Sequence, residues 1–315
     1  MVDLVEIPVG DDPTRTSPAT HRDPLDRVCE PTEVRRRVEA WRREGLRVAL
    51  VPTMGALHEG HLSLVRRGLE VADRVVASVF VNPTQFGPDE DFERYPRDLE
   101  GDAAKLAGAG CSLLYLPTVE AIYPPGASTF VEVEGPSRGF EGGERPGHFR
   151  GVATVVTALF LQVRPDVAIF GQKDAQQLAV VRKLVRDLHL GIEIVGAPIV
   201  REPDGLAMSS RNVYLDAAQR RAAAALSRTL AATRDRVEAG ARDAEALANE
   251  IRRQLETETA GLGVVDYVAI VGADDFEPIP QLVGSVVIAI AVRFGATRLL
   301  DNLHLDLGVE SPAIP

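Results

Sequence analysis

Short apolar segments alternate with helix-like segments through the first two-thirds of the chain, and this alternation is the strongest constraint on the fold. The apolar segments are rich in β-branched residues, which is typical of buried strands, and cover residues 46–52, 75–81, 112–117, 166–170 and 192–200. Helical patterns cover residues 32–44, with Thr32 as the expected N-cap, and 62–72, 97–110, 152–163 and 174–188. Because crossovers this short join parallel strands, the pattern predicts an α/β fold with a Rossmann-like, doubly wound parallel sheet. Ligands of such sheets bind beyond the carboxyl ends of the strands.

The pattern changes near residue 200, which predicts a second and smaller domain. Asp216 and Gln219 resemble a capping box at the start of an Ala- and Arg-rich helical stretch. Residues 264–305 then have the pattern of strands and turns, so this domain is expected to be α+β. The predicted parts are a disordered N-terminal extension over 1–26, a catalytic domain over 27–200 and the smaller C-terminal domain over 201–315.

Composition excludes several classes of protein. Lys and Arg number 35 against 46 Asp and Glu, and the net charge of −11 argues against a nucleic-acid binder, which needs a basic surface. The most apolar stretch, residues 282–292, is far shorter than the roughly 20 residues that span a bilayer. Cys29 and Cys111 are too few for a disulfide framework, which fits a reducing compartment. Since the N-terminus also lacks the apolar core of a signal peptide, we expect a cytoplasmic protein.

The segment PTMGALHEGH, residues 52–61, joins the end of a predicted strand to the start of a helix. Gly55 and Gly60 permit close backbone approach, and the free N–H groups of a helix start attract phosphate. His58 and His61 are three residues apart, so both could face that phosphate and donate to its developing charge. The spacing does not fit the His-Glu-x-x-His zinc motif, and the chain contains no P-loop motif. The alternative is an ordinary strand-to-helix turn with surface histidines.

Two further segments carry groups that suit phosphate. In MSSRN, residues 208–212, two hydroxyls and the permanent cation of Arg211 form a possible phosphate clamp, although alone such a loop is more often a surface turn. In FGQKD, residues 170–174, Lys173 can meet a phosphate as a point charge and Asp174 can cap the following helix. Three such segments at the ends of parallel strands indicate a site for a nucleoside triphosphate.

The histidine turn and the MSSR loop together resemble the nucleotidylyltransferase superfamily. Within it, five strings resemble the pantothenate synthetase (pantoate–β-alanine ligase) family in matching order: PTMGALHEGH (52–61), FVNPTQFGP (80–88), GHFRGVATVV (147–156), FGQKDAQQL (170–178) and VREPDGLAMSSRN (200–212). The resemblance implies that (R)-pantoate attacks ATP to give pantoyl adenylate and pyrophosphate, and that β-alanine then displaces AMP to give pantothenate. It also implies Mg²⁺ beside ATP and a homodimer.

Matching the motifs residue by residue implies a set of site residues. The implied ATP contacts are Met54, Gly55, Ala56, Leu57, His58, Glu59, Gly60, His61, Gly171, Gln172, Lys173, Asp174, Val200, Met208, Ser209, Ser210 and Arg211. The implied contacts for pantoate and β-alanine are Pro52, Thr53, Met54, Asn82, Gln85 and Gln177. The implied catalytic residues are His61 as proton donor, His58, Lys173 and Arg211. A glutamine amide both donates and accepts hydrogen bonds, which suits a hydroxy acid.

One residue departs from the family pattern, and a second residue and one segment extend the set of implied contacts. Gln172 stands where relatives often have Glu, so any role that needs this negative charge is in question. Asp102 is the candidate carboxylate on the Mg²⁺ side, with a solvated helix charge as the alternative. The Gly-rich segment 141–148 resembles a loop that closes over the site, with Glu141 and Arg145 as contacts.

Other functions remain open at this point. Another nucleotidylyltransferase would share the histidine turn, but the NPTQF and DAQQL strings favour a carboxylate substrate. A tRNA synthetase is disfavoured by the acidic composition and by the lack of an anticodon-sized module. A non-catalytic ATP-binding protein is the third alternative, and intact His58, His61, Lys173 and Arg211 argue against it.

Overall fold

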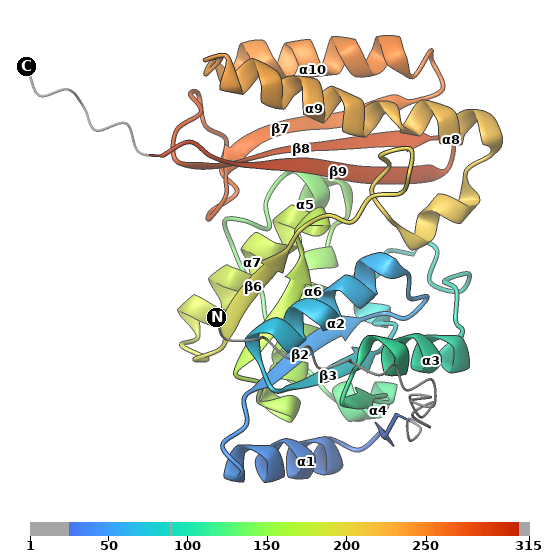
Figure 1. Ribbon diagram of the computed structural model, residues 1–315, viewed down its shortest axis with the longest axis vertical. Helices are drawn as coiled ribbons and strands as arrows, with labels where there is room; N and C mark the ends of the chain where they lie inside the picture. The colour runs from blue at the N-terminus through green and yellow to red at the C-terminus, as the bar shows by residue number, and fades with distance from the viewer. Residues whose placement is uncertain (1–24, 89, 309–315) are drawn as a thin grey trace, which may run out of the picture.

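The computed structural model describes residues 25–88 and 90–308, so nearly all of the predicted N-terminal extension lies outside the described residues. A six-stranded parallel sheet fills the lower half of Figure 1 and has the strand order β1-β4-β3-β2-β5-β6. Its strands are β1 (Arg27–Val28), β2 (Val48–Thr53), β3 (Arg74–Val79), β4 (Leu113–Tyr115), β5 (Val167–Gly171) and β6 (Glu193–Ala197). The predicted doubly wound sheet is therefore confirmed. The edge strand β1 was not predicted, because two residues are too few to show a periodicity.

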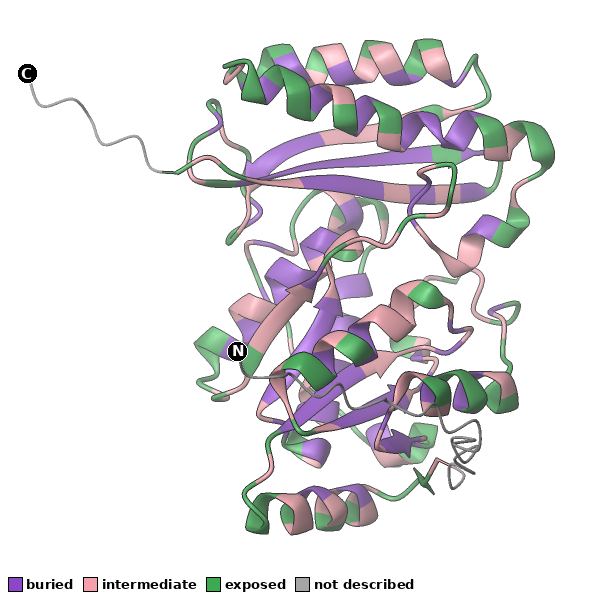
Figure 2. Cartoon of the chain, in the orientation of Figure 1, coloured by how far each residue is buried: buried purple, intermediate pink, exposed green. Residues whose placement is uncertain are grey.

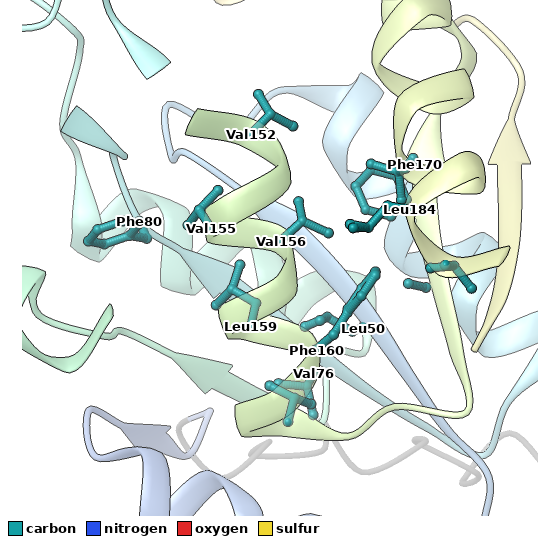
Figure 3. Packing of buried hydrophobic residues seen from close by; sticks show 14 of the residues in the cluster. Leu50, Val76, Phe80, Val152, Val155, Val156, Leu159, Phe160, Phe170 and Leu184 are labelled. Atoms are coloured by element: carbon teal, nitrogen blue, oxygen red, sulfur yellow. The ribbon is translucent and has the colours of Figure 1, made fainter. Parts of the chain in front are cut away.

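Helices cover both faces of this sheet. One face packs against α1 (Pro31–Arg43), α6 (His148–Val163) and α7 (Ala175–Asp187), and the other against α2 (Glu59–Val71) and α3 (Leu99–Ala109). Successive side chains of a strand point to opposite faces of the sheet. In β2, Val48 and Leu50 therefore lie in one core, whereas Ala49 and Val51 lie in the other. Figure 3 shows the first core, where the apolar stripe of α6 packs against the sheet. The four inner strands, β2 to β5, are consequently buried along most of their length (Figure 2).

The order of the strands reverses between β2 and β5. From β2 the chain proceeds outward through β3 to β4, and it then returns to place β5 on the opposite side of β2, followed by β6. At such a switch point the loops leaving two neighbouring strands diverge to opposite faces and leave a crevice between them. Here these loops are residues 54–58, after β2, and the turn η2 (Gln172–Asp174), after β5.

The C-terminal part is a three-stranded antiparallel sheet with helices, which confirms the predicted α+β character. It contains α8 (Ala217–Ala223), α9 (Ala225–Glu238), α10 (Ala244–Glu258), β7 (Val264–Gly272), β8 (Ser285–Phe294) and β9 (Thr297–Asp306). The capping box of Asp216 and Gln219 is present at the start of α8. Figure 1 shows α9 and α10 over one face of this sheet, and small residues of its other face pack against Ala175 and Ala179 of α7. The exact boundary at residue 200 stays a prediction.

Three local expectations were wrong. Helix α1 begins at Pro31, with Glu30 as the N-cap residue, because proline is favoured in the first helical turn; Thr32 lies inside the helix. Asp174 precedes α7 but makes no capping hydrogen bond. The segment 141–148 is not an open loop, since it contains α5 (Phe140–Glu144) and the start of α6.

The remaining short elements are α4 (Val119–Ile122), η1 (Pro83–Gln85) and η3 (Ser210–Tyr214). Within the ranges that the structure describes, every helix is too short or too polar to cross a membrane.

Candidate active site

A cavity lies at the switch point between β2 and β5, and segments far apart in the sequence line it. Many of the predicted site residues meet there: Pro52, Thr53, Met54, His58, Gly60, His61, Asn82, Gln85, Gly171, Lys173, Asp174, Gln177, Val200 and Met208. The histidine turn, the NPTQF and DAQQL strings, the FGQKD turn and the start of the MSSR loop therefore contribute to one site.

The two histidines form a reciprocal cap at the start of α2. His58 Nδ1 accepts the N–H of Gly60 at 3.2 Å, and His61 Nδ1 accepts the N–H of His58 at 3.3 Å. A backbone N–H can only donate, so each neutral ring must carry its proton on Nε2. The cap thus fixes one tautomer in both rings and leaves Nε2–H as the group that each ring can offer to a ligand in the cavity.

Burial keeps both rings neutral. It lowers the pKa of His61 to about 3, and the neighbouring His58 acts in the same direction. The pKa of His58 is also lowered, first by burial and then by the charge of Lys173. The ring centroids are 4.1 Å apart, so a proton on one ring disfavours a proton on the other. Two neutral imidazoles can donate hydrogen bonds to phosphate oxygens without carrying a buried charge.

The lowered pKa of His61 predicts a loss of stability in mild acid. In the unfolded chain the His61 ring has its ordinary pKa of about 6.5. Below that pH the ring takes up a proton in the unfolded chain but stays neutral in the folded protein, and this difference favours unfolding. We expect this residue to reduce the free energy of unfolding by up to about 1.4 kcal/mol per pH unit between about pH 6.5 and its folded value. Denaturant unfolding of the natural protein and of His61→Gln at about pH 7 and pH 5 measures this effect. An identical pH dependence in the two proteins would contradict it.

Gly60 allows the approach of His58. A Cβ at this position would lie 2.9 Å from both Cε1 and Nδ1 of His58, which is shorter than real contacts allow. Gly60→Ala should therefore push the imidazole out of the cap and lower kcat by about 10²-fold, the cost of misplacing a reacting group by about 1 Å. Gly108→Ala in α3, where an added Cβ would meet no atom of the described residues within 4 Å apart from its own helix backbone, is the matched control and should keep full activity. Equal rates for the two variants would refute the steric argument.

Asp102 lies beneath the histidine turn and outside the cavity lining. Its side chain is buried, and Oδ1 accepts the N–H of Leu57 at 2.8 Å. Its other oxygen approaches Gly55, whose φ of +86° suits glycine, and Lys105 donates to the carbonyl of Leu57. This carboxylate therefore supports the loop, and its role as a Mg²⁺ ligand stays a prediction. Across residues 25–88 and 90–308, no group of three or more His, Cys, Asp or Glu side chains could hold a metal ion.

Amide groups and apolar side chains form another part of the cavity wall. Asn82 Nδ2 donates to Gln85 Oε1 at 3.0 Å, and Gln85 Nε2 contacts the sulfur of Met54 at 3.1 Å. Apolar side chains complete the wall, and most are labelled in Figure 3: Phe80, Val152, Val155, Val156, Leu159 and Phe170. Such a pocket suits a small molecule with an apolar body and oxygen atoms at its ends.

Several predicted ATP contacts lie just outside the cavity lining. They are Gly55, Ala56, Leu57, Glu59, Gln172, Ser209, Ser210 and Arg211. Arg211 forms a two-pronged ion pair with Asp91, at 2.9 Å and 3.2 Å, which lowers the pKa of that carboxyl although burial alone would raise it. Glu59 pairs with Arg66 on the surface of α2. Their contacts with ATP stay predictions.

The sequence analysis missed other residues of this region. Tyr95 lines the cavity, and burial raises the pKa of its hydroxyl. His148 is buried beside Gln85, and burial lowers its pKa to about 4. Glu141 and Arg145 pair with Arg298 and Glu90, respectively, and their predicted contacts with a ligand stay predictions. No local periodicity marks such residues, because their partners lie far away in the sequence.

Comparison with known proteins agrees with this site. The family described as Pantoate-beta-alanine ligase matches residues 27–304, which is most of the chain and includes every segment of the cavity. The chain belongs to this family. The pantothenate synthetase of Rhodospirillum rubrum is 56% identical over 275 residues, covering 86% of this chain and 96% of that protein. The pantothenate synthetase of Paramagnetospirillum magneticum is 55% identical over 87% of this chain and 95% of its own length.

Solved structures extend the similarity within the pantoate–β-alanine ligase family. The crystal structure of pantothenate synthetase from Thermus thermophilus aligns with a TM-score of 0.80 at 49% identity and covers 89% of this chain and 99% of that one. The pantoate–β-alanine ligase of Francisella tularensis aligns with a TM-score of 0.70 at 29% identity over 89% of this chain and 97% of that one. Its crystals contained β,γ-ATP and β-alanine.

Proposed function

We propose that this chain condenses (R)-pantoate with β-alanine at the expense of ATP, through a pantoyl-adenylate intermediate. A carboxylate oxygen of pantoate attacks the α-phosphorus of ATP, the bond to the bridging oxygen breaks, and pyrophosphate leaves. The amine of β-alanine then attacks the acyl carbon, AMP leaves with both electrons of the broken bond, and the nitrogen loses a proton. AMP is the better leaving group because a free carboxylate would have to expel oxide.

One observation carries this proposal. The cavity is lined by two chemically different sets of groups: the imidazoles of His58 and His61 with Lys173, and the amides of Gln85 and Gln177 with apolar side chains. The first set suits phosphate oxygens and the second suits a branched hydroxy acid. Because one cavity holds both sets, a carboxylate and a phosphate could bind in it together, as the first step needs.

The residues of the chain supply binding and charge stabilisation. The Nε2–H groups of His58 and His61 and the ammonium of Lys173 would donate to phosphate oxygens as charge moves toward pyrophosphate. Gln85 and Gln177 would hold the oxygens of pantoate, and Val200 and Met208 would contact the nucleotide. Arg211 would add a permanent cation once phosphate replaces Asp91 as its partner.

The test is isotope transfer in the first step. Pantoate labelled with ¹⁸O in its carboxylate should yield AMP that carries one labelled oxygen, and pyrophosphate without label. Omitting β-alanine should allow one burst of pyrophosphate per site and no further turnover. Unlabelled AMP would rule out the acyl adenylate, and the absence of pantoate-dependent pyrophosphate would remove the ligase proposal in favour of another nucleotidylyltransferase or a non-catalytic ATP-binding protein.

Three further points belong to the proposal. Mg²⁺ would come with ATP as the counter-ion of its phosphates, since the described residues do not form a metal cage, and we assign no step to it. We also propose a homodimer, which sedimentation equilibrium would test. A cytoplasmic location agrees with the free cysteines Cys29 and Cys111, and fractionation of cells tests it.

A further inference from the structure

We infer that Tyr123 is a positioning residue for the substrate cavity: by holding Asn82 in the orientation that backbone groups give it, Tyr123 keeps one end of the Gln85 amide turned toward the cavity. Tyr123 follows the short helix α4 and does not line the cavity. It acts through Asn82, which contacts Gln85 directly. This inference rests on the proposed function, in which Gln85 binds pantoate.

Backbone groups first fix the orientation of Asn82. Its Oδ1 accepts the N–H of Thr84 at 3.3 Å, and its Nδ2 donates to the carbonyl of Gly151 at 3.2 Å. An N–H can only donate and a carbonyl can only accept, so the opposite orientation of this amide would lose both bonds. The hydroxyl of Tyr123 makes the shortest contact with Asn82 and donates to Oδ1 at 2.7 Å. The Asn82 side chain is almost fully buried, so water cannot replace a lost partner.

The orientation of Asn82 then determines that of Gln85. Because Nδ2 of Asn82 can only donate, the Gln85 atom that it meets at 3.0 Å must be the oxygen, Oε1. The NH₂ group of Gln85 is therefore the end turned toward Met54 in the cavity wall. The N–H of Thr84 and the carbonyl of Gly151 thus fix the orientation of the Asn82 amide. Asn82 in turn fixes the orientation of the Gln85 amide in the cavity wall.

The backbone of this segment cannot shift to change the result. The carbonyl of Gln85 accepts from His148 Nδ1 at 2.9 Å and from Arg145 Nη2 at 3.3 Å. Arg145 is held by Glu90 at 2.6 Å and 2.8 Å. Helix α6 also approaches so closely that a Cβ on Gly151 would lie 2.4 Å from the carbonyl oxygen of Thr84. What can still vary at Gln85 is the direction of its side-chain amide, which Asn82 sets and Tyr123 helps to hold.

The consequence is a preference for a ligand that accepts at this point. A cavity that offers N–H donors favours a carboxylate or hydroxyl oxygen and disfavours an NH₂ group placed there. The carboxamide analogue of pantoate lacks the nucleophilic carboxylate, so turnover is lost for that reason alone. We expect that the analogue also binds more weakly than pantoate, because its NH₂ group would face the NH₂ group of Gln85.

The experiment compares Tyr123→Phe with Tyr115→Phe. Tyr115 is a buried tyrosine whose hydroxyl donates to Gln162 Oε1 at 2.6 Å, and neither residue lines the cavity, so this variant removes the same group without touching the relay. For Tyr123→Phe we expect the KM for pantoate to rise by about three- to ten-fold, the value of one hydrogen bond, with the KM for ATP unchanged. The binding preference for pantoate over its carboxamide should shrink by a similar factor. Tyr115→Phe should change neither quantity.

A third variant separates this inference from the proposed function. Gln85→Glu replaces the donor with an acceptor and should raise the KM for pantoate more than Tyr123→Phe does. If Gln85→Glu has no effect, the placement of pantoate at Gln85 fails. If Gln85→Glu raises the KM while Tyr123→Phe leaves both the KM and the preference unchanged, the relay is overturned and the proposed function remains.

Discussion

Replacing His61 with alanine is expected to lower kcat for pantoate-dependent pyrophosphate release by about 10²–10³-fold, the usual cost of removing one preorganised donor to a developing charge. The ring is neutral because burial lowers its pKa to about 3, and its Nδ1 is occupied by the N–H of His58. Its Nε2–H is therefore a fixed donor, and fixed donors favour a transition state in which charge increases on phosphate. Rapid-quench measurement of the first turnover tests this step apart from product release.

The control for His61→Ala is His189→Asn. His189 is exposed after α7 and has a φ of +49°, a conformation that asparagine tolerates well. We expect full activity for this variant. His61→Ala with an undiminished first turnover would remove His61 from the catalytic residues, whereas a normal first turnover followed by slow β-alanine transfer would place it in the second step.

The largest expected effect on stability comes from Arg201. It lies in the segment that leads from β6 to the MSSR loop, and its guanidinium binds both oxygens of Asp301 in β9, at 2.7 Å and 2.9 Å. The side chain of Asp301 has no exposed surface. Arg201→Met should therefore leave a buried carboxylate without its counter-charge and reduce the free energy of unfolding by about 3–5 kcal/mol.

Two further variants make the Arg201 prediction specific. The double variant Arg201→Met/Asp301→Leu also removes the unpaired buried carboxylate, so it should recover most of the lost free energy of unfolding. Arg220→Met breaks ion pairs with Glu202 and Asp204, both partly exposed, and should cost no more than about 1 kcal/mol. Guanidinium unfolding curves measure all three, and similar losses for Arg201→Met and Arg220→Met would contradict the role of burial.

The Arg201–Asp301 pair also bears on the site. The next residue, Asn302, donates from Nδ2 to the carbonyls of Gln172 and Lys173, at 2.9 Å and 2.8 Å. Strand β9 of the C-terminal sheet thus holds the turn that carries Lys173. The contact between Asn302 and Gln172 is made by the backbone carbonyl of Gln172, so it does not depend on the side chain at this position.

The sequence alone determined most of the long elements of this protein and the edge of the sheet where its site lies. Runs of apolar β-branched residues and an apolar period of about 3.6 depend on neighbours within a few residues, so β2, α2, β5 and α7 could be predicted from short windows. The histidine turn was recognisable for the same reason, since His58, Gly60 and His61 form their cap within one helical turn. The switch point between β2 and β5 was not predicted, because the order of strands in the sheet depends on pairing between distant segments.

Only the tertiary structure decided how side chains are used. Asp102 supports the loop of Leu57 across 45 residues, and Tyr123 orients Asn82 across 41, and neither pairing leaves a periodic signal. The pKa of His61 likewise depends on burial by elements from several parts of the chain. Local sequence sets backbone periodicity because it acts through adjacent residues, whereas the polarity, burial and partners of a side chain are fixed only when distant segments pack together.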